Sequence, residues 1–361
     1  MELPVDPLAD HWLDLANAQL LPAPRIVVPP IVVPVPVDPL GIAGPTRGRS
    51  RGPHWRQSSP NRFVPAHVDG TVPAQRIVEV VQQTPSGAVT GWASLHLAGA
   101  RWFEGRLADG RHRGVPVALG RGVARSSIRG GVVTRACLTD DEVVLRHGIR
   151  CTSIHRALFD EVVLLDDVRR GVEAIEMAFH AELTSRARFG AWLATQPRRV
   201  GNRLVRGALE LALEGAESPQ ETRMHLVWRL DAGLPTPVLN QNIFDLDGRF
   251  LARVDLLDPV AGVVGEYDGE SHRATRSRRN DVRREGDLRR AGLEFFSVVA
   301  GELASPEHVV QRMRWARGKA LSTALARGLV NGRRRAWALT PPNGVRPMGL
   351  DERIERRRRP R

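Results

Sequence analysis

The spacing of apolar residues between positions 219 and 325 constrains the fold more than any other feature of this chain. Three stretches have the spacing of helices, residues 219–232, 274–291 and 306–325. Four short apolar runs predict strands, residues 240–246, 249–257, 262–268 and 293–299. Asp247-Gly248 between the first two runs is a strong hairpin signal. This order predicts an α/β domain: a mixed sheet with a three-strand meander, flanked by helices.

Acidic residues gather where these strands are expected to end. Asp255 ends one predicted strand, and Glu266 and Asp268 lie two residues apart on the next, so their side chains share one face. Carboxylates spaced at about 7 Å on one face repel each other, and a divalent cation relieves that repulsion. The alternative is a surface cluster of ion pairs with nearby arginines. We expect Asp255 and Glu266 to bind Mg²⁺ or Mn²⁺.

Two further residues extend this candidate site, and each has an ordinary structural alternative. Glu221 is a candidate third metal ligand, but Ser218-Pro219-Gln220-Glu221 also fits a capping box at a helix start. His272 follows Glu266 by six residues, and it is either a general acid–base or an ordinary loop histidine. The predicted catalytic set is therefore Glu221, Asp255, Glu266, Asp268 and His272.

The charge balance favours a polyanionic partner. Lys and Arg total 53 against 40 Asp and Glu, the net charge is +13, and the sequence pI is near 11.3. Lys319 is the only lysine, so the arginine excess also fits the codon usage of a GC-rich genome. In the helix after the site we expect Arg279, Arg283 and Arg284 to hold a DNA backbone. The alternative is a charged solvent face with pairs one helical turn apart.

The rest of the chain predicts a smaller α+β domain ahead of the one that carries the acidic motifs. The expected division is a disordered Pro/Arg-rich segment (1–60), an α+β domain (61–150), a helical connector (151–215), the motif-bearing domain (216–325) and a disordered basic tail (326–361). Prolines interrupt the apolar run at residues 26–40, which excludes a membrane-spanning helix there. Two cysteines and no signal-peptide pattern lead us to expect a reduced, cytoplasmic protein without a membrane partner.

The motifs together resemble the PD-(D/E)XK nuclease superfamily and, more closely, its very-short-patch-repair-type endonuclease domain. The matching segments span under a third of the chain: Glu221-Thr-Arg-Met, Val254-Asp255-Leu-Leu-Asp-Pro, Gly265-Glu266-Tyr-Asp268-Gly269, His272, and Asp281-Val-Arg-Arg-Glu285. The resemblance implies a restriction-endonuclease-like mixed sheet flanked by helices. It also implies a Mg²⁺-dependent endonuclease that hydrolyses phosphodiester bonds in DNA, in repair or in defence against foreign DNA.

The chain departs from the superfamily at one position. The third motif of the superfamily usually ends in a lysine that orients or deprotonates the attacking water, whereas Asp268 stands there in this chain. The very-short-patch-repair-type domain also carries aspartate at this place. Arginine cannot replace the base, because its pKa stays above about 12. Either a water activated by the cation, with help from His272 or Glu266, is the nucleophile, or the site is inactive.

Residues upstream resemble AbiEi-like antitoxin or regulator proteins. Three segments carry this looser match: Arg62-Phe-Val-Pro65, Val89-Thr-Gly-Trp92-Ala and Cys151-Thr-Ser-Ile-His155-Arg-Ala-Leu-Phe. They imply binding of DNA or of a partner from a toxin–antitoxin or defence system. The alternative function is therefore a catalytically inactive DNA-binding regulator or antitoxin-like protein. The sequence indicates no oligomeric state.

Overall fold

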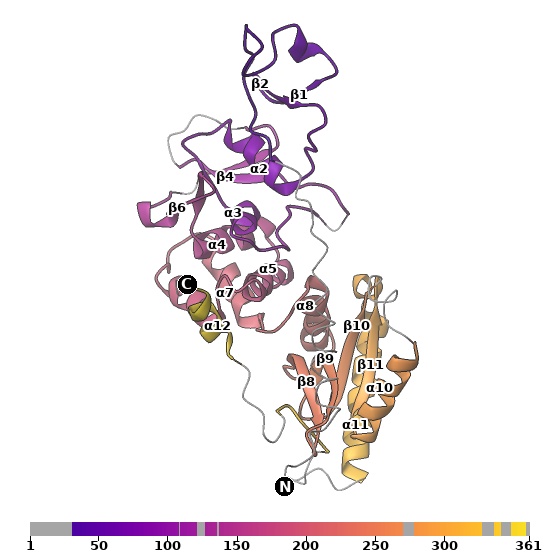
Figure 1. Cartoon of the computed structure of the whole chain (residues 1–361). Helices are drawn as coiled ribbons and strands as arrows, with labels where there is room; N and C mark the ends of the chain where they lie inside the picture. The colour runs from indigo at the N-terminus through magenta and orange to yellow at the C-terminus, as the bar shows by residue number, and fades with distance from the viewer. Residues whose placement is uncertain are drawn as a thin grey trace, which may run out of the picture. The chain divides into compact units, whose positions relative to one another are not determined.

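The computed structural model describes residues 31–107, 109–120, 127–135, 137–269, 278–326, 336–340 and 348–358, without the side chains of 278–282, 324–326 and 358 (Figure 1). The chain divides into two compact units, residues 1–68 and 69–361, and each is described by itself. Within the described ranges, no helix has both the length and the apolar character that crossing a membrane requires.

The first unit contains a β-hairpin. Strand β1 (Trp55–Ser59) pairs antiparallel with β2 (Arg62–Pro65), a short helical turn η1 (Arg49–Arg51) precedes it, and Val35 bridges to Phe63. The predicted disorder of residues 1–60 is therefore wrong for residues 31–60, which include the Val35 bridge, η1 and β1, while residues 1–30 lie outside the described ranges. The prolines earlier in the segment obscured this hairpin. Asn61 closes it with φ +58°, a left-handed conformation that asparagine tolerates.

The second unit begins with a five-stranded mixed sheet of order β5-β4-β3-β7-β6. Its strands are β3 (Ala88–Val89), β4 (Val115–Ala118), β5 (Gly131–Thr134), β6 (Val143–Arg146) and β7 (Ile149–Thr152). Its helices are α2 (Pro73–Val81), α3 (Gly91–Leu97), α4 (Ile154–Leu165), α5 (Val168–His180), α6 (Arg186–Ala194) and α7 (Asn202–Leu211). The helical stretch expected from Cys151 begins later, at Ile154. Cys151 is itself a strand residue of β7, where it pairs with Val144 of β6. Buried aliphatic and aromatic side chains of α3, α4 and α5 form the core beside this sheet.

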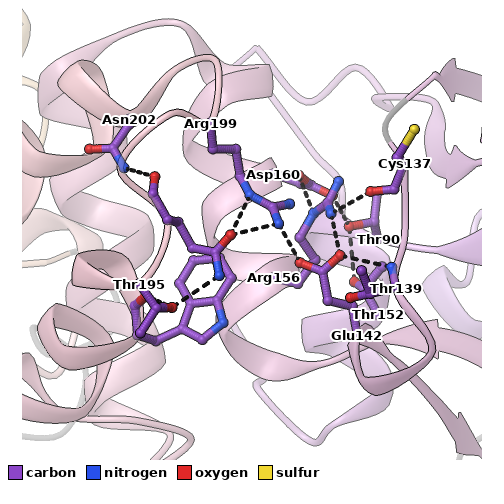
Figure 2. A network of polar contacts seen from close by, with 12 residues as sticks. Thr90, Cys137, Thr139, Glu142, Thr152, Arg156, Asp160, Thr195, Arg199 and Asn202 are labelled. Carbon is purple, nitrogen blue, oxygen red and sulfur yellow. Dashed lines mark hydrogen bonds and ion pairs between the residues drawn. The ribbon is translucent and has the colours of Figure 1, made fainter.

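A buried polar network ties α4 to this sheet (Figure 2). Arg156 is only 1% exposed and donates to Asp160 at 2.9 Å and to Glu142 at 2.9 Å. Arg199 reaches the other oxygen of Glu142 at 2.7 Å. Thr90 donates its hydroxyl to Asp160 at 2.6 Å. Two guanidinium groups thus balance two buried carboxylates, which a low-dielectric interior requires.

The second sheet of the same unit carries the predicted motifs and has the order β11-β10-β9-β8-β12. Its strands are β8 (Val238–Asp245), β9 (Phe250–Asp258), β10 (Val263–Asp268), β11 (Glu294–Val299) and β12 (Trp337–Ala338). Strands β8, β9 and β10 form an antiparallel meander, and β10 pairs parallel with β11. The predicted α/β class, with mixed sheets flanked by helices, is therefore confirmed.

Helices lie on both faces of this sheet. They are α8 (Pro219–Leu226), which runs into a π-helical turn η3 (Val227–Asp231), then α10 (Arg278–Arg290) and α11 (Glu307–Ala326), with a 3-10 turn η4 (Glu302–Ala304) before α11. Val263 and Phe296 share a core with Met313 of α11, and Phe296 stacks on Trp228 of η3 at 5.7 Å between ring centroids. Val264, one residue along β10, joins Leu288 of α10 in a second cluster. The alternation of strand side chains therefore assigns α11 to one face and α10 to the other.

Helix α8 is fixed to α5 by a fully buried carboxylate. Glu176 is 0% exposed, accepts from Thr222 at 2.6 Å, and lies 2.8 Å from Nε2 of His225. It also accepts the backbone N–H of Leu213 at 2.6 Å. A buried acid with three polar partners is held in one place, and so is the helix that supplies two of them.

The predicted disorder of residues 326–361 is wrong for two pieces. Strand β12 adds to the sheet beside β8, with Trp337 buried, and helix α12 (Leu350–Arg358) buries Leu350 and Ile354. Asp351 accepts from Ser185 at 2.6 Å and from Arg188 at 3.0 Å. The many arginines suggested a solvated tail, but a few apolar residues are enough to anchor these pieces.

Removing Arg156 should leave Glu142 and Asp160 buried without their shared cation. We expect Arg156→Ala to lower the free energy of unfolding by about 3–5 kcal/mol. Arg150→Ala, at an exposed position of β7, should stay within about 0.5 kcal/mol of the wild type. Urea denaturation followed by circular dichroism measures both. Equal stability of the two variants would contradict a stabilising role for the network.

Candidate functional site

The first residues of α8 hold Glu221 in a cap. Ser218 is the N-cap, Pro219 takes the first helical position, and the Ser218 hydroxyl oxygen accepts the N–H of Glu221 at 3.3 Å. The Glu221 carboxylate accepts the Glu217 N–H at 2.8 Å and the Ser218 hydroxyl at 2.9 Å. The capping role considered for Glu221 is confirmed.

The same carboxylate also faces the sheet, through Asn240. The side-chain amide of Asn240 donates to Glu221 at 2.5 Å and to the carbonyl of Gly215 at 2.9 Å. Asn240 lies in β8 with φ +49°, a left-handed backbone that is rare within a strand. Asn240 is not among the site residues predicted from the sequence. The only signal was an asparagine, a residue depleted in strands, inside an apolar run.

Asp255 lies next to this pair. Leu239 is opposite Leu256 and Gln241 is opposite Val254, so the register sets Asn240 across from Asp255. Asp255 does not end its strand as predicted, because β9 continues through two leucines to Asp258. The backbone pairing of β9 with β10 ends at Leu256 and Gly265. There the Asp255 carboxylate accepts the N–H of Tyr267 at 2.8 Å, so a side chain continues the ladder.

Asp258, the next acid along β9, has a structural role. Its carboxylate accepts the N–H groups of Val260 at 2.9 Å and Ala261 at 3.1 Å, which closes the turn into β10. Arg317 of α11 donates to its other oxygen at 2.8 Å. These contacts fix the turn and make Asp258 separate from the site.

Glu266 is held by an arginine. Both terminal nitrogens of Arg284 donate to the two oxygens of Glu266, and one of them also donates to the carbonyl of Arg253. Both side chains are mostly buried, 17% exposed for Glu266 and 21% for Arg284. Glu266 shares the strand face of Val264, which packs on α10, the helix that carries Arg284. The guanidinium predicted to hold phosphate thus neutralises the carboxylate predicted to hold metal.

The remaining predicted residues stand at different places. Asp268 is the last residue of β10, partly buried, two residues beyond Glu266 and on the same face. Arg283 is exposed on α10. His272 and the side chain of Arg279 lie outside the described residues. The structure therefore brings Glu221 and Asp255 together and pairs Glu266 with Arg284.

Electrostatics link Glu221 to Asp255. Burial raises the pKa of Glu221, the Glu217 N–H opposes that shift, and the charge of Asp255 raises the pKa further. A cation near the two carboxylates would favour their ionised forms. Mg²⁺ is commonly held by one or two protein carboxylates, with water or phosphate completing its shell. The donor chemistry of Glu221 and Asp255 fits such an ion.

Glu266 would join that set only if Arg284 moved away. Within the ranges that the structure describes, no cluster of three or more His, Cys, Asp or Glu side chains is arranged to hold a metal ion. The site is thus a two-carboxylate site with an arginine-paired third acid beside it.

No family model, no curated protein and no solved structure matches this chain.

The raised pKa of Glu221 should make stability depend on pH. The folded protein binds this proton more tightly than the unfolded chain, whose glutamate titrates near 4.5. The contribution of Glu221 is therefore greatest below the unfolded pKa and declines as pH rises through the folded pKa. We expect Glu221→Gln to remove this decline, so that the stability of the variant relative to wild type increases with pH over that window.

Urea denaturation from weakly acidic to weakly alkaline pH measures this difference. The readout is the slope of the free energy of unfolding against pH. Loss of the Glu221 hydrogen bonds lowers this free energy by the same amount at every pH, so it does not change the slope. Glu307→Gln, at an exposed position of α11, is the matched control. Parallel curves for wild type and Glu221→Gln would show that Glu221 does not retain its proton in the fold.

Arg284→Gln should free Glu266 of its guanidinium. We expect a decrease of about 1–3 kcal/mol in stability without metal, because a mostly buried carboxylate is left without its charged partner. Added Mg²⁺ or Mn²⁺ should then raise the melting temperature of this variant more than that of wild type, since Glu266 becomes available to the ion. Arg283→Gln, one residue away and exposed, is the control. Equal metal-induced shifts in all three proteins would exclude Glu266 as a ligand.

Proposed function

We propose that residues 216–325 form a metal-dependent endonuclease that hydrolyses phosphodiester bonds in DNA, in repair or in defence against foreign DNA. The observation that carries this proposal is the convergence of Glu221, Asn240 and Asp255 beside the end of the β9–β10 pairing. The sequence motifs resemble the very-short-patch-repair-type domain, and this resemblance, which implies a restriction-endonuclease-like fold, supports the same function. The proposed cofactor is Mg²⁺ or Mn²⁺.

The residues of the site divide into cation ligands and residues that orient them. Glu221 and Asp255 hold the cation, and Asn240 orients Glu221 by donating to its carboxylate. When bound, a divalent cation supplies Lewis-acid stabilisation of phosphate charge and lowers the pKa of a water. Asp268, at the place of the superfamily's lysine, is a second metal ligand or orients His272, the proposed general acid–base.

The arginines beside the site fit the polyanionic substrate. Arg283 is exposed on α10, whereas Arg289 and Arg290 in its last turn pair with Glu285 and Asp287, as the alternative of a charged solvent face expects. Exposed cations on one helix attract a phosphate backbone without selecting a base sequence. Binding of DNA here would also offer Arg284 a phosphate in place of Glu266, which would release Glu266 at the moment substrate arrives.

Cleavage of supercoiled plasmid by the purified protein tests the proposal. We expect nicking with Mg²⁺ or Mn²⁺, none with EDTA, and a fall of roughly a hundredfold or more in Asp255→Ala, which lacks a carboxylate that positions the charge-stabilising ion. Asp247→Ala, in the exposed turn between β8 and β9, is the matched control and should cleave as wild type. Unchanged cleavage in Asp255→Ala would overturn this assignment of the site.

The Arg284–Glu266 pair favours a second candidate, a DNA-binding regulator or antitoxin-like protein with an inactive nuclease fold. An arginine that permanently neutralises Glu266, together with aspartate in place of lysine at position 268, would leave no complete catalytic set. The AbiEi-like resemblance upstream supports this candidate and implies a toxin or defence-system partner. Salt-sensitive DNA binding without metal-dependent cleavage would establish it in place of the endonuclease.

A further inference from the structure

The loop at residues 38–45 of the first unit is held rigidly by one carboxylate. Asp38 accepts the backbone N–H groups of Leu40 at 3.0 Å, Ile42 at 2.8 Å and Ala43 at 2.8 Å. Those N–H groups, with that of Ala43 first, hold the pKa of Asp38 below its ordinary value, so the loop keeps its clamp at neutral pH. The backbone N–H of Asp38 donates to Pro45 at 2.9 Å and closes the loop.

Two large apolar side chains stand at the tip of this rigid loop. Leu40 is 79% exposed and Ile42 is 84% exposed, more than any other large apolar residue near them in the chain. Gly41 between them has φ +69°, the left-handed conformation that lets the chain turn sharply at the tip. Leu40 and Ile42 are exposed aliphatic residues close together on an ordered loop. Such a pair indicates a contact surface, because aliphatic side chains are not favoured in contact with water.

Arginines lie directly beside this tip. Arg47, Arg49 and Arg51 are all exposed in the turn that follows the loop. Nη1 of Arg49 lies 4.0 Å from where a Cβ would stand on Gly41, so its guanidinium is against the tip. The turn is itself ordered, since Ser50 donates its N–H to Thr46 at 2.9 Å. We call Leu40, Ile42 and these three arginines the tip surface.

We propose that the tip surface binds double-stranded DNA, with the arginines on phosphates and Leu40 and Ile42 packed against bases in the minor groove. Proteins that insert aliphatic side chains between base steps combine an apolar wedge with flanking cations in this way. The Asp38 carboxylate accepts from its own loop's backbone, and the three arginines are exposed to a phosphate. A rigid loop also avoids the ordering cost that a flexible one would meet on binding. This surface is independent of the carboxylate site.

Binding of the full-length protein to a duplex that carries a fluorescent base analogue tests the wedge. We expect wild type to raise the fluorescence as bases unstack. Leu40→Ser/Ile42→Ser should abolish this rise and bind about tenfold more weakly, because the apolar wedge is removed. Leu145→Ser is the matched control, since Leu145 is 72% exposed on β6 and outside the tip surface. An unchanged rise in the double variant overturns the proposal, as does the absence of any rise with wild type.

The contribution of the three tip-surface arginines to DNA binding is measured separately, by the salt dependence of the binding constant K. We expect Arg47→Gln/Arg49→Gln/Arg51→Gln to reduce the slope of log K against log salt by about 0.9 for each phosphate that is no longer neutralised. Both readouts are taken in EDTA, where no metal-dependent cleavage occurs, so a failed nuclease assignment would not affect this result. The proposal is overturned if the triple variant has the same slope as wild type. It is also overturned if the tip surface binds lipid vesicles or protein and not the duplex.

Discussion

The buried carboxylate of Glu176 is the interaction on which the candidate site depends. It is enclosed completely, and an acid in that position is tolerated only because Thr222, His225 and the N–H of Leu213 surround it. Thr222 follows Glu221 directly, so the bond that satisfies Glu176 also fixes the turn that presents Glu221. Glu176 on α5 therefore sets the position of Glu221 on α8. A helix that packs beside the first five-stranded sheet thus holds a residue of the candidate site in place.

Arginine serves as an internal cation throughout this chain. Arg156 pairs with the buried acids Glu142 and Asp160. Arg317 pairs with Asp258 at the β9–β10 turn, and Arg284 pairs with Glu266. Guanidinium suits this work, because its planar fork meets a carboxylate with two donors and keeps its charge when partly buried. The number of arginines thus overstates the cations available to a polyanion, since several are committed to internal pairs.

The second sheet could be predicted from the sequence nearly element by element, because its strands and helices are short, strongly periodic and separated by clear turn signals. Of the candidate residues, Glu221 and Asp255 are linked through Asn240 and by the effect of the Asp255 charge on the pKa of Glu221. Other features depended on contacts between distant positions. Nothing local to Glu266 shows that Arg284 would pair with it, and nothing local to Asn240 shows that it would bind Glu221 from a left-handed position in a strand. The ordered pieces of the tail were not predicted because their few apolar anchors, such as Ile354, lie among many arginines.

The packing of α12 on α6 has a consequence for how the protein is made. The hydrogen bond from Ser185 to Asp351 joins residues 166 positions apart. Ribosomes add about 5–20 residues per second, so the α6 surface that receives α12 stays uncovered for roughly ten to thirty seconds of synthesis. During that interval Ser185 and Arg188 lack Asp351, and the core cluster lacks Leu350 and Ile354, so this part of the unit is completed only when the end of α12 has been made.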